Sequence, residues 1–591
     1  MGSFLKTIFA TIVGVFVAFA LIVVVAIGML VTTASKIGSA EEQVQLKDNT
    51  VLVLKFDKPV SEVANDLPWD DFPLPFTTSN GTLGLHKLRN AISQAKTDDK
   101  VAGILLEGGQ FQGGFGIETE VREALEDFKK SGKFIYSYAN NMSEGGYYLN
   151  SIADEIYLNP AGNIELNGLS VELQYFKDFF AKIGVEPEVF RVGKYKSAVE
   201  PFITDKMSDA NREQISAYLN SMYDYYLDVV AASRNIDRAE LKRVSDEMLV
   251  RNPDDALKSK LVTQVAYRNK MMEDLKVKLG QDAESKLNLL TVEKFMKSLK
   301  ADKSHSSNKI AVLVCEGDIV DGKGQIGQIG GDDIADRLRK LREDDDVKAV
   351  VLRVNSPGGS ALASDIMWHE VQLMKEKKPI IASMSSYAAS GGYYMSMGCD
   401  KIVALPNTIT GSIGIFGLAL NPSNLFEDKM GINTYAVSTG KYSNFMSLLD
   451  DFTEEEKSII QQNVNEGYER FTSKAAAGRN MSKDALLEIA QGRVWTGADA
   501  IRIGLVDKLG GIEQAIVLAA EQAEVGEDYE VEYIPKEKNL LESLFEDLAD
   551  DYTEYSLKNK LGPMYEVYKQ MELAFGLQGV NARLPYTLDI K

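Results

Sequence analysis

The chain is 591 residues long, which exceeds one ordinary folding unit and predicts several domains. Hydrophobic residues make up 45% and charged residues 26%, a balance that is typical of folded globular proteins and excludes a disordered chain. A net charge of −21 argues against non-specific nucleic-acid binding, which requires a basic surface, so we expect no nucleic-acid partner.

The first predicted element is a membrane anchor over residues 8–31. These 24 residues carry no charge, and at about 1.5 Å per residue a helix of this length crosses the hydrocarbon core of a bilayer. Signal-peptide cores are shorter, although Gly-Ser-Ala at 38–40 resembles a cleavage site, so a removed leader stays an alternative. The charges around the segment, Lys6 before it and the acidic pair at 41–42 after it, favour a cytoplasmic N-terminus. The rest of the chain would then lie on the external side of the membrane.

The rest of the chain contains an internal repeat. From Glu144 and Ser390 to Pro160 and Pro406 the two copies keep a constant offset of 246 residues, which indicates a duplicated domain and not a solenoid. The matching segments are 49–57 with 308–316, 103–109 with 350–359, 143–148 with 389–394, and 154–160 with 400–406.

The repeat predicts the domain organisation. We expect an N-terminal repeat over residues 47–299, a polar linker over 300–308 and a C-terminal repeat over 309–535. An acidic and aromatic extension over 536–591 follows, and its composition predicts no role.

Each copy alternates short apolar runs with amphipathic segments. In the second copy a helix is predicted over Ala361–Lys377, with Ser360 as its N-cap. Strand–helix–strand units of this length predict right-handed parallel crossovers and an α/β fold in both copies. The predicted strands of the second copy are Ile310–Val314, Ala349–Val354, Pro379–Met384 and Lys401–Leu405.

Ser390 lies in the glycine-rich stretch Tyr387–Tyr394, after a predicted strand and before a helical segment. A nucleophilic serine suits this position, because the helix N-terminus favours developing negative charge and the small neighbours admit a substrate. An ordinary capping serine in a tight turn is the alternative. The segment Arg353–Ser360 ends another strand, and its glycines could supply backbone N–H groups for an oxyanion hole, or simply form a turn into the helix.

A serine nucleophile needs a base, and the histidines are poorly placed for that role. The chain has 3 histidines: His305 lies in the linker, and His86 and His369 lie on predicted helices. This argues against a Ser-His-Asp triad. Lysine can replace histidine if burial lowers its pKa, and Lys196 lies within the largely apolar segment 190–202. An ordinary structural or solvated lysine is the alternative.

Comparison of the two copies links Lys196 to Ser390. Gly-Lys-Tyr-Lys at 193–196 matches Gly-Lys-Tyr-Ser at 440–443, so the second copy has Ser443 where the first has Lys196. Conversely, the first copy has Glu144 where the second has Ser390. Each copy lacks what the other retains, which predicts one composite Ser-Lys dyad between the two domains, with the lysine amine within about 3.2 Å of the serine hydroxyl.

Four ordered motifs resemble the signal peptide peptidase A family in its long two-repeat form, over nearly the whole chain to about residue 530. They are Tyr-Lys-Ser-Ala-Val-Glu-Pro-Phe at 195–202, Arg-Val-Asn-Ser-Pro-Gly-Gly-Ser at 353–360, Ala-Ala-Ser-Gly-Gly-Tyr-Tyr at 388–394 and Thr-Gly-Ser-Ile-Gly-Ile at 410–415. The resemblance implies two tandem β-α-β superhelical domains like those of the Clp protease and crotonase superfamily.

The resemblance also implies a role for individual residues. It makes Ser390 the nucleophile, Lys196 the general base and Ser412 the group that orients the lysine amine. Gly359 and Gly391 become the oxyanion donors, with Gly358 as the alternative to Gly359. No metal or other cofactor is implied.

For the whole protein the resemblance implies a serine endopeptidase that degrades remnant signal peptides after preprotein processing. Hydrophobic peptides and the lipid bilayer are the implied partners, in a homo-oligomer that is tetrameric in the long form. The implied location is the inner membrane of a bacterium, with the catalytic part on the periplasmic or external side. An apolar groove would suit such peptides, and Ile413, Ile415 and Phe416 either line it or pack in the core.

One departure from the family pattern is Lys194, which would help to lower the pKa of Lys196 if the two amines were close, or else points to solvent. Cys315 and Cys399 show no metal-binding spacing and are expected to be buried thiols, with a disulfide as the alternative. Two other functions stay open: a crotonase-like acyl-CoA enzyme, and a non-catalytic peptide-binding membrane scaffold.

Overall fold

A computed structural model describes Gly14 and residues 46–64, 81–299, 306–325, 327–447, 450–535 and 579–584. The predicted anchor over 8–31, apart from Gly14, most of the linker and most of the C-terminal extension lie outside these described residues. Among the described residues, no helix has both the length and the apolar character needed to cross a bilayer.

The N-terminal repeat is built on a six-stranded parallel sheet with the order β8-β6-β5-β4-β1-β9. Its central strands consist of buried aliphatic and aromatic residues, as a parallel sheet covered on both faces requires. The strands are β1 (Thr50–Leu54), β4 (Val101–Glu107), β5 (Phe134–Met142), β6 (Glu155–Ile164), β8 (Gln264–Val265) and β9 (Asn288–Thr291).

The C-terminal repeat has the same topology, which confirms the predicted duplication and the α/β class. Its strands follow the order β20-β16-β15-β13-β10-β21, and β17 and β19 extend the sheet beyond β15. The strands are β10 (Lys309–Glu316), β13 (Val347–Ser356), β15 (Ile380–Ala389), β16 (Lys401–Ala404), β17 (Ile409–Gly411), β19 (Val494–Thr496), β20 (Lys508–Leu509) and β21 (Glu530–Ile534).

β15 continues five residues past its predicted end at Met384. The polar residues Ser385 and Ser386 that follow are buried against the other repeat. Ser385 donates to Glu62, and the Ser386 hydroxyl accepts from Gly116 N–H at 3.1 Å at the start of helix α3 (Phe115–Lys129). Contacts between the repeats therefore extend the strand that leads to Ser390.

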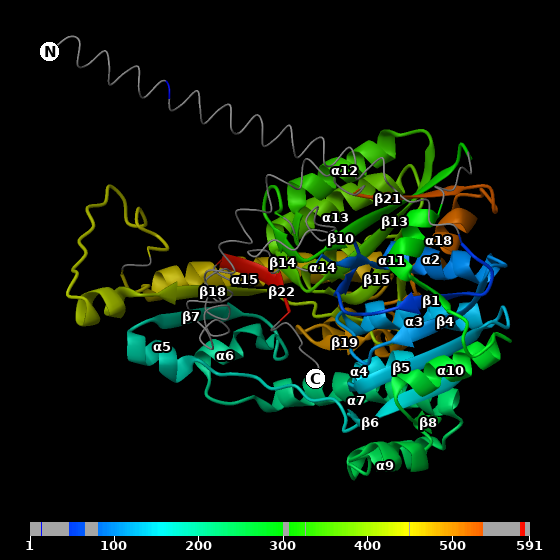
Figure 1. Ribbon diagram of the computed structural model, residues 1–591. Coiled ribbons are helices and arrows are strands. Elements are labelled where there is room, and N and C mark those ends of the chain that lie inside the picture. The colour runs from blue at the N-terminus through cyan, green and yellow to red at the C-terminus, as the bar shows by residue number, and fades with distance from the viewer. Residues whose placement is uncertain are drawn as a thin grey trace.

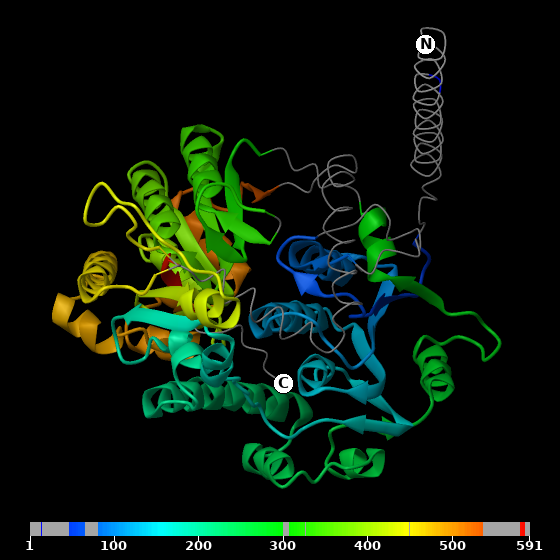
Figure 2. The same ribbon diagram turned by 90° about the vertical axis from the view of Figure 1, so that its left-hand side faces the viewer.

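Helices cover both faces of the two sheets, and Figure 2 shows the two repeats facing each other. The predicted helix of the second copy is α13 (Ala361–Lys375), and Ser360 caps it by accepting from Ala363 N–H at 3.2 Å. The other helices are α2 (Leu85–Thr97), α4 (Glu144–Asn150), α5 (Lys177–Ile183), η1 (Ser197–Val199), α6 (Glu200–Ile203), α7 (Asp209–Arg234), α8 (Arg238–Asp246), α9 (Pro253–Lys258), α10 (Arg268–Lys278), α11 (Val292–Ser298), α12 (Gly331–Glu343), α14 (Gly391–Ser396), η2 (Leu425–Lys429), α15 (Glu454–Gly478), α16 (Lys483–Ile489), α17 (Gly497–Arg502) and α18 (Ile512–Gln522).

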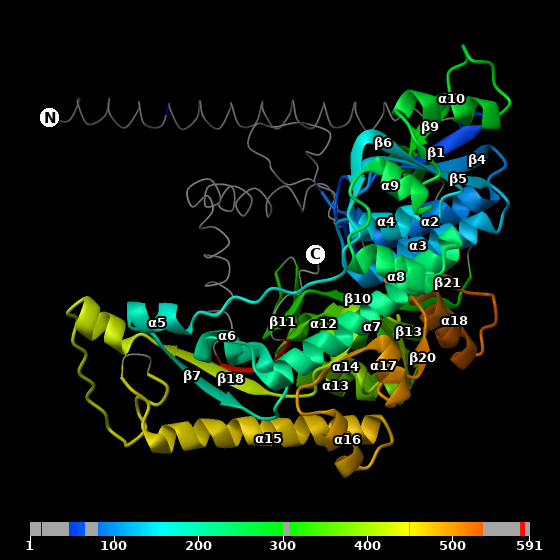
Figure 3. The same cartoon turned by 90° about the horizontal axis from the view of Figure 1, so that it is seen from below.

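A third sheet joins the repeats, with the order β12-β11-β14-β22-β18-β7. β7 comes from the N-terminal repeat and pairs antiparallel with β18 of the C-terminal repeat along six residue pairs. Figures 1 and 3 show β7 and β18 side by side, at the end of an arm that also carries α5 and α6. The strands are β7 (Glu186–Arg191), β11 (Asp318–Val320), β12 (Gln328–Gly330), β14 (Gly358–Ser360), β18 (Phe416–Asn421) and β22 (Gly579–Arg583), and a separate pair consists of β2 (Val60–Ser61) and β3 (Leu83–Gly84).

Candidate active site

Ser390 lies between the last residue of β15 and the first residue of α14. Its backbone has φ 54° and ψ −109°, a left-handed conformation that is costly for a residue with a side chain. The Ser390 N–H donates to the Gly411 carbonyl of β17 at 2.8 Å, and the residue is fully buried. The junction between strand and helix thus fixes the hydroxyl in a strained position.

Lys196 lies on the loop between β7 and η1, and the C-terminal repeat holds this loop in place. Tyr195 N–H donates to the Gln491 carbonyl at 3.1 Å. Gly492 has φ +77°, and a Cβ at this position would lie 2.7 Å from the Lys196 Cβ. Only a glycine leaves room at this position for the lysine stem.

The two side chains meet inside the protein. Lys196 Nζ lies 2.8 Å from Ser390 Oγ, and it also lies 3.1 Å from Ser412 Oγ and 3.3 Å from the Ser412 carbonyl oxygen. Lys196, Ser390 and Ser412 all have no exposed side-chain surface. Two hydroxyls and an amine, drawn from both repeats, therefore form one hydrogen-bonded group.

Burial holds the pKa of Lys196 well below its usual value, because the apolar surroundings penalise the charged amine. Lys194 has no part in this effect: it is exposed, with its Nζ 4.6 Å above the Tyr195 ring. The Phe416 ring lies 5.9 Å from Lys196 Nζ, and Ile413 and Ile415 are buried in the main core of the C-terminal repeat.

Three glycines were predicted from the sequence as candidate oxyanion donors. As the first residue of α14, Gly391 has an N–H without an intrahelical acceptor. Gly358 has φ +103°, and its N–H donates to Ser356 Oγ at 3.2 Å. Gly359 lies in β14 and pairs with Ile319 of β11 and Ala582 of β22.

A polar network below Lys196 was not predicted from the sequence. Gln214 Nε2 of α7 donates to Ser197 Oγ at 2.8 Å and to the Tyr195 carbonyl at 3.1 Å, and Ser197 Oγ donates to Asn211 Oδ1 at 2.9 Å. Gln214 and Asn211 are fully buried and three residues apart on one face of α7. Buried polar residues at this spacing were a signal in the sequence, but their target depends on where α7 packs.

Other residues considered in the sequence lie elsewhere. His369 is exposed on α13 and His86 stacks on Tyr533, while His305 lies outside the described part of the chain. Ser443 is exposed in the segment before α15. Cys315 and Cys399 are buried free thiols.

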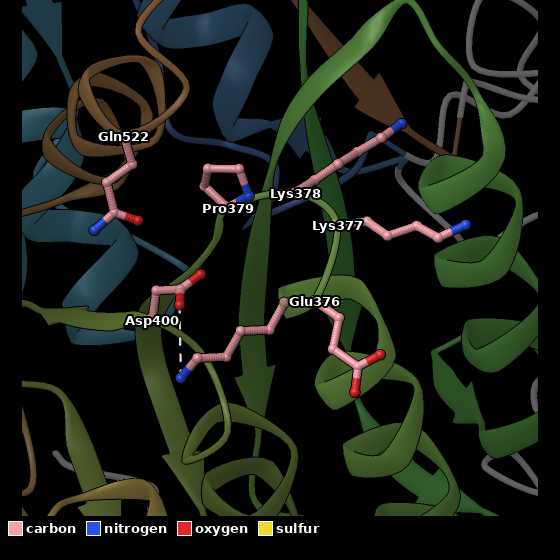
Figure 4. A pocket seen from close by; sticks show the side chains of 7 residues that line it. Glu376, Lys377, Lys378, Pro379, Asp400 and Gln522 are labelled. Atoms are coloured by element: carbon pink, nitrogen blue, oxygen red, sulfur yellow. Dashed lines mark ion pairs between the residues drawn. The ribbon is translucent and has the colours of Figure 1, made fainter.

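A surface depression near the C-terminal end of α13 lies away from these groups. Lys375, Lys378, Asp400 and Gln522 help to line it, and Lys375 Nζ forms an ion pair with Asp400 Oδ1 at 3.5 Å. Figure 4 shows Lys378, Asp400 and Gln522 around this depression. It lies at the amino ends of β15 and β16, whereas Ser390 follows the carboxyl end of β15, roughly 30 Å of strand away. Ligands of parallel sheets bind at the carboxyl ends, so we do not assign the substrate to this depression.

Comparison with known proteins places this geometry in a family. The model of peptidase family S49 matches residues 127–282 and 372–526, once in each repeat. Protease 4 of Haemophilus influenzae is 35% identical over 590 residues, which cover 95% of this chain and 94% of that protein. A putative signal peptide peptidase SppA of Enterococcus faecium is 37% identical over 233 residues, covering 39% of this chain and 67% of that protein.

Among solved structures, a mutant ClpP1 from Listeria monocytogenes matches 35% of this chain and 94% of its own, with a TM-score of 0.24 and 15% identity. The resemblance to signal peptide peptidase A that the motifs indicated is confirmed by the relatives, and neither an acyl-CoA enzyme nor a non-catalytic scaffold agrees with them. Two matches to one family model and a relative that aligns along nearly the full length show that this chain belongs to peptidase family S49 and is a serine protease.

Proposed function

We propose that Ser390 is the nucleophile of this protease and that Lys196 is its general base. The observation that carries the proposal is the 2.8 Å contact between Lys196 Nζ and Ser390 Oγ, in a site where burial lowers the pKa of the lysine. A neutral amine at hydrogen-bond distance can take the hydroxyl proton, and a charged one cannot.

The reaction is acyl transfer. Neutral Lys196 takes the proton of Ser390 as Oγ attacks a peptide carbonyl, and the resulting lysinium then protonates the leaving amine. Water hydrolyses the acyl-enzyme by the reverse proton transfers. Activity should rise with pH as Lys196 loses its proton, and the lowered pKa brings that rise below the usual range of lysine.

Ser412 orients the amine in this proposal. Its hydroxyl at 3.1 Å and its carbonyl at 3.3 Å can both accept hydrogen bonds from Nζ, which leaves a lone pair of the neutral amine for the Ser390 proton. In this proposal Ser412 acts through the lysine amine, so it is a positioning residue.

The oxyanion is stabilised by the N–H groups of Gly391 and Gly359. Gly391 follows the nucleophile directly, at the start of α14 where the helix dipole favours negative charge. The engagement of Gly358 N–H with Ser356 Oγ favours Gly359 over Gly358 as the second donor.

The substrates we propose are remnant signal peptides, because the relative in Enterococcus faecium is named a putative signal peptide peptidase and such peptides are apolar. The uncharged segment 8–31 supports a single membrane anchor that brings the enzyme to them, in the inner membrane with the catalytic part outside the cytoplasm. We propose a homotetramer on the resemblance to the long two-repeat form alone.

The test is a peptidase assay of the detergent-solubilised full chain. Ser390→Ala and Lys196→Ala should each lower kcat/KM for an apolar peptide by at least about 10³-fold, since a dyad fails as a unit. The matched control is Lys194→Ala, which removes an exposed amine two residues away and should change the rate less than twofold. Full activity in either dyad variant, with an unchanged circular dichroism spectrum, would reject the assignment.

A further inference from the structure

One buried side chain connects the loop of Lys196 with the C-terminal repeat. Gln214 belongs to α7 of the N-terminal repeat and is fully buried where this helix packs against β19 of the C-terminal repeat. A primary amide has two N–H donors and one carbonyl acceptor, so it can bind groups on two sides at once. The donors and the acceptor of Gln214 face different repeats, and each finds a partner next to the proposed dyad.

The donors hold the chain on both sides of the proposed base. Gln214 Nε2 donates to the Tyr195 carbonyl at 3.1 Å and to Ser197 Oγ at 2.8 Å. Asn211, one turn earlier on α7, accepts from Ser197 Oγ at 2.9 Å. The stem of a lysine is flexible, so its amine stays at one point only if the backbone that carries it is fixed. These three bonds fix the chain immediately before and after Lys196.

The acceptor of the same amide holds the strand that positions the serine. Val494 N–H of β19 donates to Gln214 Oε1 at 3.3 Å. Val494 pairs with Gly411 of β17, and the Gly411 carbonyl accepts the Ser390 N–H at 2.8 Å. One side chain therefore links the backbone around the lysine to the ladder that holds the serine, across the boundary between the repeats.

Arg493, which precedes β19, extends this link to Ser412, because its carbonyl accepts the Ser412 N–H at 2.7 Å. The Arg493 guanidinium lies over the Tyr195 ring at 4.9 Å, with Nη1 3.0 Å from Glu213 Oε1. Both members of this ion pair are partly exposed, whereas the buried amide network around the lysine carries no charge. Neutral groups fix the loop without adding a charge that would change the proton affinity of a nearby amine.

We propose that Gln214 is a positioning residue of the protease reaction. It sets the 2.8 Å contact between Lys196 Nζ and Ser390 Oγ, because it holds the lysine loop on the strand that positions the serine. This inference rests on the proposed Ser-Lys dyad, and the effect of Gln214 on the reaction passes through the lysine. Glutamate has the shape of glutamine but lacks its N–H donors, and methionine has neither donors nor a carbonyl acceptor, so these residues cannot make both links.

The first experiment compares Gln214→Met with the wild type in the peptidase assay of the full chain. We expect kcat to fall at least about tenfold, because a misplacement of about 1 Å is enough to slow a reaction strongly. KM should change less than about twofold, since peptide binding does not require proton transfer. As a control, Asn220→Met changes an exposed amide of the same helix and should leave both constants within about twofold of the wild type. A folded Gln214→Met enzyme with the wild-type kcat overturns the inference.

The second experiment measures the pH at which kcat is half-maximal, which a residue that only adds stability would not shift. In Gln214→Met the loosened loop admits water to the amine, and in Gln214→Glu a carboxylate lies beside the lysine loop. Both changes favour the charged lysine, so the midpoint should rise by about 0.5 to 1 pH unit in each variant. A midpoint equal to that of the wild type in both variants overturns the inference.

Two further variants keep this inference separate from the proposed dyad. If Lys196→Ala keeps full activity, the dyad fails and the role of Gln214 fails with it. If Lys196→Ala is inactive and Gln214→Met keeps the wild-type kcat, the dyad stands and only the role of Gln214 is overturned. Ser197→Ala removes one of the two bonds of Nε2 and takes the place of Gln214→Met if that variant does not fold. Its kcat should fall about threefold, and an unchanged kcat overturns the inference.

Discussion

The two repeats build the same strand–helix junction in different ways. In the N-terminal repeat Ser143 has φ −72° and ψ 168° and caps α4 through Gly146 N–H at 3.1 Å, so Glu144 begins a regular helix. In the C-terminal repeat the equivalent of Glu144 is Ser390, with φ 54° and ψ −109° and no side-chain cap. One copy has a relaxed junction and the other a strained one.

This difference shows that the shared fold does not require the strain at Ser390, which agrees with the role proposed for that residue. The sheets that carry the two junctions have the same strand order, so the topology does not require the unusual backbone conformation of Ser390. Strained residues persist only where the surroundings over-determine them. At Ser390 these surroundings are the Gly411 carbonyl, which holds its N–H, and Lys196, which holds its hydroxyl.

The copies also differ at Glu107 and Arg353, which occupy equivalent positions of β4 and β13. Glu107 forms ion pairs with Lys55 and Arg268 of its own repeat. Arg353 is 1% exposed and reaches into the other repeat, with Nη2 2.8 Å from Glu62 Oε1 and Nη1 2.9 Å from Glu120 Oε1. The C-terminal copy thus uses a buried cation to join the two domains.

The largest expected effect on stability comes from removing this buried cation. Arg353→Leu leaves Glu62 buried without its cation and removes one of the two cations paired with Glu120, which should cost about 3–5 kcal/mol. Thermal unfolding should occur on the order of 10 °C earlier. Adding Glu62→Gln and Glu120→Gln should recover part of the loss, and a melting temperature that Arg353→Leu leaves unchanged would contradict the role of the network.

A smaller effect is expected from removing the buried amine. Above its lowered pKa Lys196 is neutral in the folded chain, while the unfolded chain binds a proton up to the ordinary lysine pKa of 10.5. The unfolded state therefore binds more protons, so this group reduces stability at neutral pH and its cost shrinks as pH rises towards 10.5. Each pKa unit corresponds to about 1.4 kcal/mol.

We therefore expect Lys196→Met to be inactive but more stable than the wild type at pH 7. Denaturant unfolding should show a gain on the order of 2 kcal/mol, and the gain should be smaller at pH 9.5. A variant that is less stable at pH 7 would show that the amine is charged in the folded protein.

The smallest effect is expected at the other junction. Burial raises the pKa of Glu144 to about 7 from 4.5, although its carboxylate accepts from Asn167 and Gly168 N–H. Between pH 4.5 and 7 the folded chain holds a proton that the unfolded chain has lost, so stability falls as pH rises through this window and stays low above it.

Glu144→Gln removes this titration. Its melting temperature should match that of the wild type near pH 4.5 and be higher at pH 8. The gain in the free energy of unfolding at pH 8 should be roughly 1 kcal/mol, because glutamine keeps only part of the hydrogen bonding. Peptidase activity should change less than twofold, since the relaxed junction supplies no reacting atom. A large loss of activity would mean that the first junction also takes part in catalysis.

Local pattern was enough to predict much of this protein. Apolar runs such as 310–314 and 349–354 predicted buried parallel strands, and the constant offset between the copies predicted the duplication that the two sheets share. The exchange of Glu144 for Ser390, and of Lys196 for Ser443, predicted from the sequence alone that the dyad draws on both copies. Patterns of this kind repeat along the chain, so no knowledge of packing is needed to find them.

Packing between distant segments decided the rest. The length of β15, the buried support that Gln214 gives to the Lys196 loop and the space that Gly492 leaves for it depend on which surfaces meet. The position of β22 is the clearest case: Gly-Val-Asn-Ala-Arg has no marked pattern of its own, and only the open edges of β14 and β18 make it a strand. A short segment carries too little apolar surface to fix its own partner, so tertiary structure chooses it.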